Sequence, residues 1–189
     1  AHVALWRMPF SVCVMHAREA ARSGLEAGDF LYASYGTMTE TWSAYQIADD
    51  LDAFAEGYAA GLELIRKLRV DSFADAHALM LGRALALLGR TESPTSLTWE
   101  SFSEEEYVRK YSDNPFFSTF HSLSKLELLY TSGEFAEALA EYRRAIPLVR
   151  HVSGTIWPVL LAFWGGWTLA ANALERGGGD GDILLGEAA

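Results

Sequence analysis

The chain has 189 residues, half of them hydrophobic, and 25 acidic against 15 basic side chains give it a net charge of −10. This length is enough for one domain with a real hydrophobic core, and the charge argues against a nucleic-acid-binding protein, which normally presents a basic face. The single cysteine, Cys13, excludes an internal disulfide, and because no segment resembles a secretion signal we expect a cytoplasmic location.

Hydrophobic spacing predicts helices from the start of the chain. The first four are expected over residues 9–27, 30–48, 51–69 and 71–88. Pro9 suits a first helical turn, and Gly28 suits the end of a helix. Asp29 and Asp50 stand where each can cap the helix that follows. The turns between these helices are therefore short.

The pattern changes after Gly89, where residues 90–102 show no helical period. Ser103 and Glu106 form a capping box that predicts a short helix ending near residue 111. Asn114 followed by Pro115 predicts the start of a sixth helix, which runs to residue 131. A seventh helix over 133–149 should weaken at Pro147. An eighth is expected over 155–176, and the Gly-rich residues 177–189 are expected to form a linker and tail.

Two of these helices share one apolar pattern, 84 residues apart. Tyr58 of the third helix aligns with Tyr142 of the seventh. The stripes comprise Leu51, Phe54, Ala55, Tyr58, Gly61, Leu62 and Ile65, and Phe135, Ala138, Leu139, Tyr142, Ala145, Ile146 and Val149. Repetition of one helix type predicts an all-α domain over 1–176, a right-handed stack of seven to eight helices in antiparallel hairpins. The expected pairs are the second helix with the third, the fourth with the fifth, and the sixth with the seventh.

Residues 155–174 carry no charge and have the length of a membrane span. Pro158, the Gly165–Gly166 pair and tryptophans spread along the segment instead of held at its ends favour a buried or half-buried helix. No membrane span is therefore predicted.

The turn and helix formed by Tyr130, Gly133, Phe135, Ala138, Leu139, Tyr142, Ala145 and Ile146 resemble the second half of a tetratricopeptide repeat. Tyr130 and Gly133 are three residues apart where that family usually has four, and Leu126 and Glu127 stand where it has a glycine. The pattern thus departs from the family in its first half.

A longer series of segments, residues 82–91, 102–106, 114–115, 133–135 and 154–157, is similar to the helical-repeat region of large bacterial signalling proteins. Those proteins combine an AAA/STAND-type ATPase with serine/threonine kinase and sensor histidine kinase modules. The resemblance implies that this chain is a piece of such a protein without the ATPase or kinase motifs. It also implies a regulatory role, in which the helices bind a protein partner or the flanking domains of the same chain.

No catalytic, metal or cofactor site is predicted. The chain has no phosphate-binding loop, and none of the five histidines is paired at i,i+4 spacing with another histidine or with Cys13. Its acidic clusters stand at predicted helix starts, where carboxylates stabilise the helix dipole. An enzyme would need a base oriented by a second residue, and no such pair is visible.

Aromatic residues on the first helices of the predicted pairs are candidates for a concave groove. These are Trp42, Tyr45, Tyr130, Phe163, Trp164 and Trp167, with His77, Arg83 and His121 as polar groups beside them. Aromatic residues at helical spacing usually belong to the core. The helical-repeat scaffold and the resemblance to signalling proteins predict, first, a non-catalytic protein-interaction module, with self-association through an exposed terminal helix as one further outcome. The alternative is a small-molecule sensor that binds its ligand in this groove.

Overall fold

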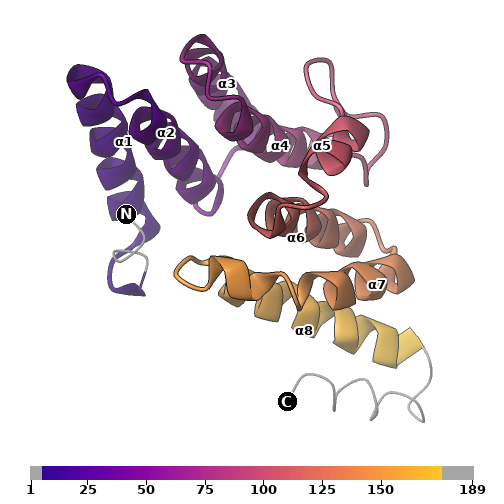
Figure 1. The fold of residues 1–189 in the computed structure, drawn as a ribbon. Helices are drawn as coiled ribbons and strands as arrows, with labels where there is room; N and C mark the ends of the chain where they lie inside the picture. The colour runs from indigo at the N-terminus through magenta and orange to yellow at the C-terminus, as the bar shows by residue number, and fades with distance from the viewer. Residues whose placement is uncertain (1–5, 176–189) are drawn as a thin grey trace. The chain divides into compact units, whose positions relative to one another are not determined.

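The computed structural model describes residues 6–175, and this part of the chain is all-α, as predicted. The helices are α1 (Phe10–Ala27), α2 (Phe30–Tyr45), α3 (Leu51–Lys67), α4 (Asp71–Leu87), α5 (Glu104–Tyr111), α6 (Pro115–Thr131), α7 (Phe135–Ala145) and α8 (Trp157–Glu175), with a short 3-10 helix, η2 (Val149–Val152), between α7 and α8 (Figure 1). The predicted linker and tail, residues 177–189, lie outside the described residues.

Local capping explains where most of the helices begin. The carboxylate of Asp29 accepts a hydrogen bond from the backbone N–H of Tyr32 at 3.2 Å, and Asp50 accepts one from Ala53 at 3.0 Å. Asn114 caps α6 in the same way, with Pro115 in its first turn. These side chains satisfy donors that a helix start leaves open, so the predicted starts of α2, α3 and α6 are confirmed.

The described chain divides into two compact units. The first unit holds α1 to α4 and the following loop, and the second holds α6, α7, η2 and α8, with α5 beginning in one and ending in the other. Each unit has its own helix packing. The stacking of hairpins into a superhelix remains a prediction.

In the first unit, α1 packs along α2, and α3 packs along α4 (Figure 1). α2 also contacts α3, whereas α4 packs along α3 and not along its predicted partner, the fifth helix. The loop after α4 is one reason, because it occupies the α4 surface. Leu97 is fully buried there, and the Trp99 indole N–H donates to the Ala78 carbonyl at 3.1 Å.

Glycines bring the α1 and α2 backbones into direct contact. A methyl group added at Gly24 would lie 2.7 Å from the backbone nitrogen of Ala33, and one added at Gly36 would lie 2.6 Å from that of Ala21. Such a distance is far below van der Waals contact, so only glycine fits at these two positions. The hairpin therefore depends on close backbone packing more than on large side chains.

In the second unit, α7 packs against both α6 and α8, and α6 also contacts α8 (Figure 1). Ala138 and Ala145 on α7 are fully buried. These small residues alternate with large ones along α7, so a second helix can lie close. Gly165 of α8 completes the contact, because the Tyr142 ring occupies the place where a side chain would stand.

Substitution of the two adjacent glycines of α8 tests this packing. A methyl group at Gly165 would meet the Tyr142 ring, whereas one at Gly166 would meet nothing within 4 Å. We expect Gly165→Ala to destabilise the second unit by about 1 kcal/mol, because ring displacement outweighs the gain in helix propensity. Gly166→Ala should stabilise it by about 0.5 to 1 kcal/mol. Amide hydrogen exchange of α7 and α8 in the two variants measures both effects, and equal changes would contradict the assigned register.

No helix in the described part of the chain combines the length and hydropathy that a membrane span needs. In α8, Leu161, Thr168, Leu169 and Asn172 are buried. The helix is therefore half-buried, one of the two forms favoured by the sequence.

Candidate partner-binding surface

The face of α8 that points away from the second unit carries large apolar side chains. Val159 is 44% exposed, Phe163 and Trp167 are each 53% exposed, and Leu174 is 83% exposed. They follow one another at intervals of four, four and seven residues, so they lie on one side of the helix. We call these four residues the α8 outer stripe.

Ring contacts hold the aromatic part of the stripe in place. The half-buried Trp164 packs on Tyr130 of α6, with ring centroids 5.7 Å apart. Phe163 stands edge-on to Trp164 at 5.1 Å and to Trp167 at 6.4 Å. The structure therefore brings together four of the predicted groove residues, Tyr130, Phe163, Trp164 and Trp167. Their rings pack against one another on the outside of α6 and α8, and Phe163 and Trp167 are the most exposed of the four.

Polar groups of α8 face inward and are satisfied there. The Thr168 hydroxyl donates to the Trp164 carbonyl at 2.8 Å, and the Asn172 amide donates to the Phe135 carbonyl at 2.7 Å. From Trp157 to Leu174 the helix has no charged side chain. The outer stripe is thus an apolar surface on a helix segment without charged side chains.

The predicted groove residues of the first unit lie in its interior. Trp42 is 7% exposed and His77 is fully buried. Both face the packing between helices and not an open surface, because α2 and α4 contact each other directly. Helical spacing identifies such positions as inward-facing, but it cannot distinguish a closed core from an open groove.

His77 has two polar neighbours in this core. Its Nε2 lies 2.9 Å from the Tyr58 carbonyl, and its Nδ1 lies 3.4 Å from the Thr41 hydroxyl. Because a carbonyl only accepts, Nε2 carries the ring proton. Burial lowers the pKa of His77 to about 4, and the bond to the Tyr58 carbonyl opposes that shift only in part. His77 is therefore neutral and structural at pH 7.

Arg83 is also buried, and its guanidinium carbon lies 4.3 Å from the centroid of the Tyr45 ring. Burial lowers the pKa of Arg83, while the charge of and hydrogen bonding with Tyr45 act in the opposite direction. A cation over an aromatic face is a favourable contact in a desolvated site. Tyr45 is half-buried, and its ring packs against the Arg83 guanidinium.

His121 is half-buried on α6, nine residues before Tyr130. Nine residues correspond to two and a half helical turns, so the two side chains leave α6 on opposite sides. His121 is therefore not part of the aromatic surface.

Val159 and Leu174 also belong to the outer stripe, although the sequence analysis did not identify them as candidates. Their spacing from Phe163 and Trp167 is the signal that could have found them.

Among residues 6–175, no three His, Cys, Asp or Glu side chains are grouped so as to hold a metal ion. Comparisons of the chain with protein-family models, with curated proteins and with solved structures found no match.

Proposed function

We propose that this domain is a non-catalytic protein-interaction module whose contact surface is the α8 outer stripe. The observation that carries the proposal is the exposure of Phe163 and Trp167, each 53%, beside Val159 and Leu174 on one helix face. Contiguous exposed apolar surface is unfavourable in water and marks interaction sites. Tryptophan and other aromatic residues are also enriched at the centres of protein interfaces.

The partner we infer is an amphipathic helix of another protein or of a flanking domain. Gly166 and Ala170 lie between the large side chains of the stripe, and nothing lies within 4 Å of a methyl group added at Gly166. A partner side chain can therefore seat beside Trp167, as in the packing of one helix on another. Resemblance to bacterial signalling proteins supports a cytoplasmic regulatory role next to an ATPase or kinase.

Site-specific photo-crosslinking in the cells from which the chain derives tests this proposal. Benzoylphenylalanine in place of Phe163 should give a discrete protein adduct that mass spectrometry identifies. Phe30 of α2 is the matched control, since it is the same residue type and 49% exposed, and the same substitution there should give no such adduct. Adding Trp167→Ser to the Phe163 variant should reduce the adduct at least tenfold, as expected for a residue at the centre of an interface.

The outcomes separate clearly. An adduct specific to position 163 and lost with Trp167→Ser supports the proposal, and an adduct with a second copy of the chain identifies self-association. No adduct at position 163, or equal adducts at positions 30 and 163, would show that the stripe is not an interaction surface. Circular dichroism of the Trp167→Ser protein establishes that the fold is retained.

A further inference from the structure

The α8 outer stripe is symmetric about its centre. Residues 166 and 167 form the central pair, Phe163 and Ala170 lie three residues outward from it on either side, and Val159 and Leu174 lie seven residues outward. A two-fold axis through this centre relates two antiparallel copies of α8. It places Phe163 of one copy at the level of Ala170 of the other, and Val159 at the level of Leu174. The stripe therefore has the symmetry that a contact between two copies of this chain requires.

These positions also share one side of the helix. With 3.6 residues per turn, the positions from Val159 to Leu174 named above fall within an arc of about 100°, and Phe163 and Ala170 lie nearest its middle. An arc of this width is the face with which a helix packs on its neighbours. One second helix can therefore contact the whole stripe.

Large and small side chains stand opposite each other in this arrangement. The Phe163 ring of one copy faces Ala170 of the other. At the centre, Trp167 stands at the level of Gly166, and nothing lies within 4 Å of a methyl group added at that glycine. Open space on one copy thus receives a large side chain of the other, as the ridges of one helix fit the grooves of its neighbour.

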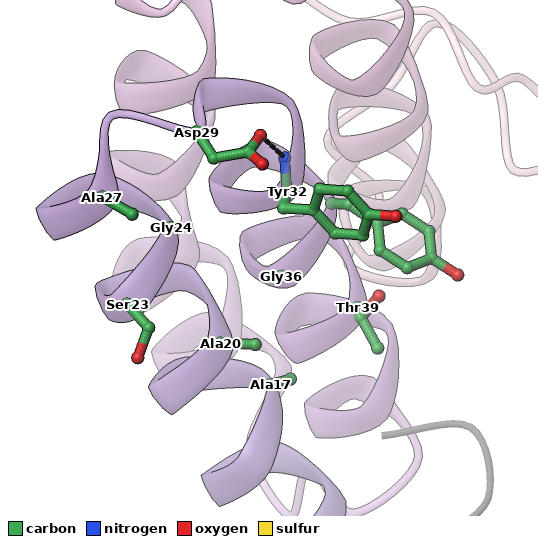
Figure 2. Close-up of a pocket in the computed structure, with 10 residues that line it drawn as sticks. Ala17, Ala20, Ser23, Gly24, Ala27, Asp29, Tyr32, Gly36 and Thr39 are labelled. Atoms are coloured by element: carbon green, nitrogen blue, oxygen red, sulfur yellow. Dashed lines mark hydrogen bonds between the residues drawn. The ribbon is translucent and has the colours of Figure 1, made fainter.

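Glycines already bring helices together elsewhere in this chain. Figure 2 shows Gly24 on α1 and Gly36 on α2 where these two helices meet. A methyl group added at these positions would lie 2.7 Å and 2.6 Å, respectively, from a backbone nitrogen of the neighbouring helix. Gly166 is exposed in the single chain, although glycine in an exposed helix interior lowers helix stability. A second copy of α8 gives this glycine the close helix contact that Gly24 and Gly36 have.

Charge favours contact through α8 over contact elsewhere on the surface. The whole chain has a net charge of −10, so two copies repel each other. From Trp157 to Leu174, α8 has no charged side chain. Two copies that meet through this segment therefore bury no charge in it and place no like charges opposite each other.

The size of the stripe determines the strength of the contact. Val159, Phe163, Trp167 and Leu174 expose 44%, 53%, 53% and 83% of their surface, which amounts to on the order of 400 Å² per copy. Two copies together remove about 800 Å² of this apolar surface from water, and the small residues between the large ones add to the area. Stable specific interfaces begin near about 1,200 Å². The contact is therefore expected to be weak and reversible.

We propose that a second copy of this chain covers the α8 outer stripe, through an antiparallel contact between the two α8 helices with a two-fold axis between Gly166 and Trp167. This inference rests on the function proposed above, that the stripe is an interaction surface, and it identifies the occupant when no partner helix is bound. The dimer and the partner helix use the same side chains, so they exclude each other. Binding of a partner therefore requires dissociation of the dimer.

Sedimentation equilibrium of the purified chain tests for the dimer. We expect a monomer–dimer equilibrium with a Kd on the order of 10 to 100 µM, in keeping with a small interface. Phe163→Ser should raise the Kd at least tenfold, as expected for an aromatic residue at the centre of an interface. Phe30→Ser is the matched control, because Phe30 of α2 is 49% exposed, and it should leave the Kd unchanged. Added salt should not weaken the dimer, since it screens the repulsion between two acidic chains.

Disulfide crosslinking tests the position of the two-fold axis. In the proposed dimer the two copies of residue 166 are separated by only about 1.5 Å along the helix direction, whereas the two copies of Ala162 are separated by roughly 14 Å. Gly166→Cys should therefore form a disulfide-linked dimer on mild oxidation. Ala162→Cys, which is exposed on the same helix, should form at least about tenfold less of it, because a disulfide needs closely spaced backbones. Cys13 is fully buried and contributes little background.

The inference is wrong if the purified chain stays monomeric up to about 0.5 mM, or if Phe163→Ser and Phe30→Ser dimerise equally well. It is also wrong if Gly166→Cys and Ala162→Cys crosslink to the same extent. Circular dichroism establishes that each variant keeps its helices. Photo-crosslinking in cells tests the heterologous partner by itself, so the inference and the proposed function can fail separately.

Discussion

Gly36→Ala is expected to destabilise the first unit by about 3 kcal/mol, at the upper end of the usual cost of overpacking. The added methyl group would lie 2.6 Å from the backbone nitrogen of Ala21, 2.9 Å from its Cα and 3.0 Å from the carbonyl oxygen of Ala17. All three atoms belong to the α1 backbone and cannot rotate away. The two helices must therefore separate, and this loss exceeds the gain of about 1 kcal/mol that alanine brings to a helix.

Gly57→Ala is the matched control. Gly57 lies within α3, is exposed, and has nothing within 4 Å of an added methyl group. The same substitution there should stabilise the unit by about 0.5 to 1 kcal/mol, because only the helix propensity changes. Native-state hydrogen exchange of the α1 and α2 amides measures both variants. A Gly36→Ala protein as stable as the Gly57→Ala protein would show that the α1–α2 backbones do not touch.

The stability of the first unit is expected to fall by about 3 kcal/mol as the pH decreases from 6.5 to 4, through His77 alone. Burial lowers the pKa of His77 from 6.5 to about 4. Between these two values the unfolded chain binds a proton that the folded chain does not, so acidification favours unfolding. Above pH 6.5 both states are neutral at this residue, and below pH 4 both are protonated, so its contribution to the slope vanishes in each range.

His77→Gln separates this effect from the titration of other groups. Glutamine retains an N–H that can donate to the Tyr58 carbonyl, but it does not titrate. The variant should lack the His77 share of the pH dependence, so the difference between the free energies of unfolding of the two proteins should change by about 3 kcal/mol from pH 6.5 to pH 4, to the disadvantage of the parent protein. Hydrogen exchange of the α3 and α4 amides at several pH values provides the measurement. Parallel pH profiles for the two proteins would contradict a buried, neutral His77.

Helix starts and buried helix faces can be predicted from the sequence because they depend on residues that are close together in the chain. The caps Asp29, Asp50 and Asn114 mark helix starts, and their hydrogen bonds form inside a single turn. The apolar stripes of α3 and α7 predict which sides are buried, since side chains three and four residues apart share a helix face. Ala138 and Ala145, which belong to the α7 stripe, are fully buried.

Helix pairing could not be read in the same way, because it depends on contacts between residues far apart in the sequence. Each of the first three turns is short, so α2 could pair with either neighbour. α2 packs along α1 because Gly24 lies directly against Ala33 and Gly36 lies directly against Ala21. Periodicity also cannot show whether an apolar face is covered, and for this reason Trp42 and Trp167 look alike in the sequence although one is buried and the other is exposed.

The all-α class, most helix starts and the aromatic character of α8 can thus be predicted from the sequence. Each follows from propensity, capping or spacing within one segment. The burial of His77 in the core and the exposure of the α8 outer stripe, in contrast, depend on how the helices pack. These properties arise when separate helices meet, and the free energy of that packing depends on the shapes of both partners.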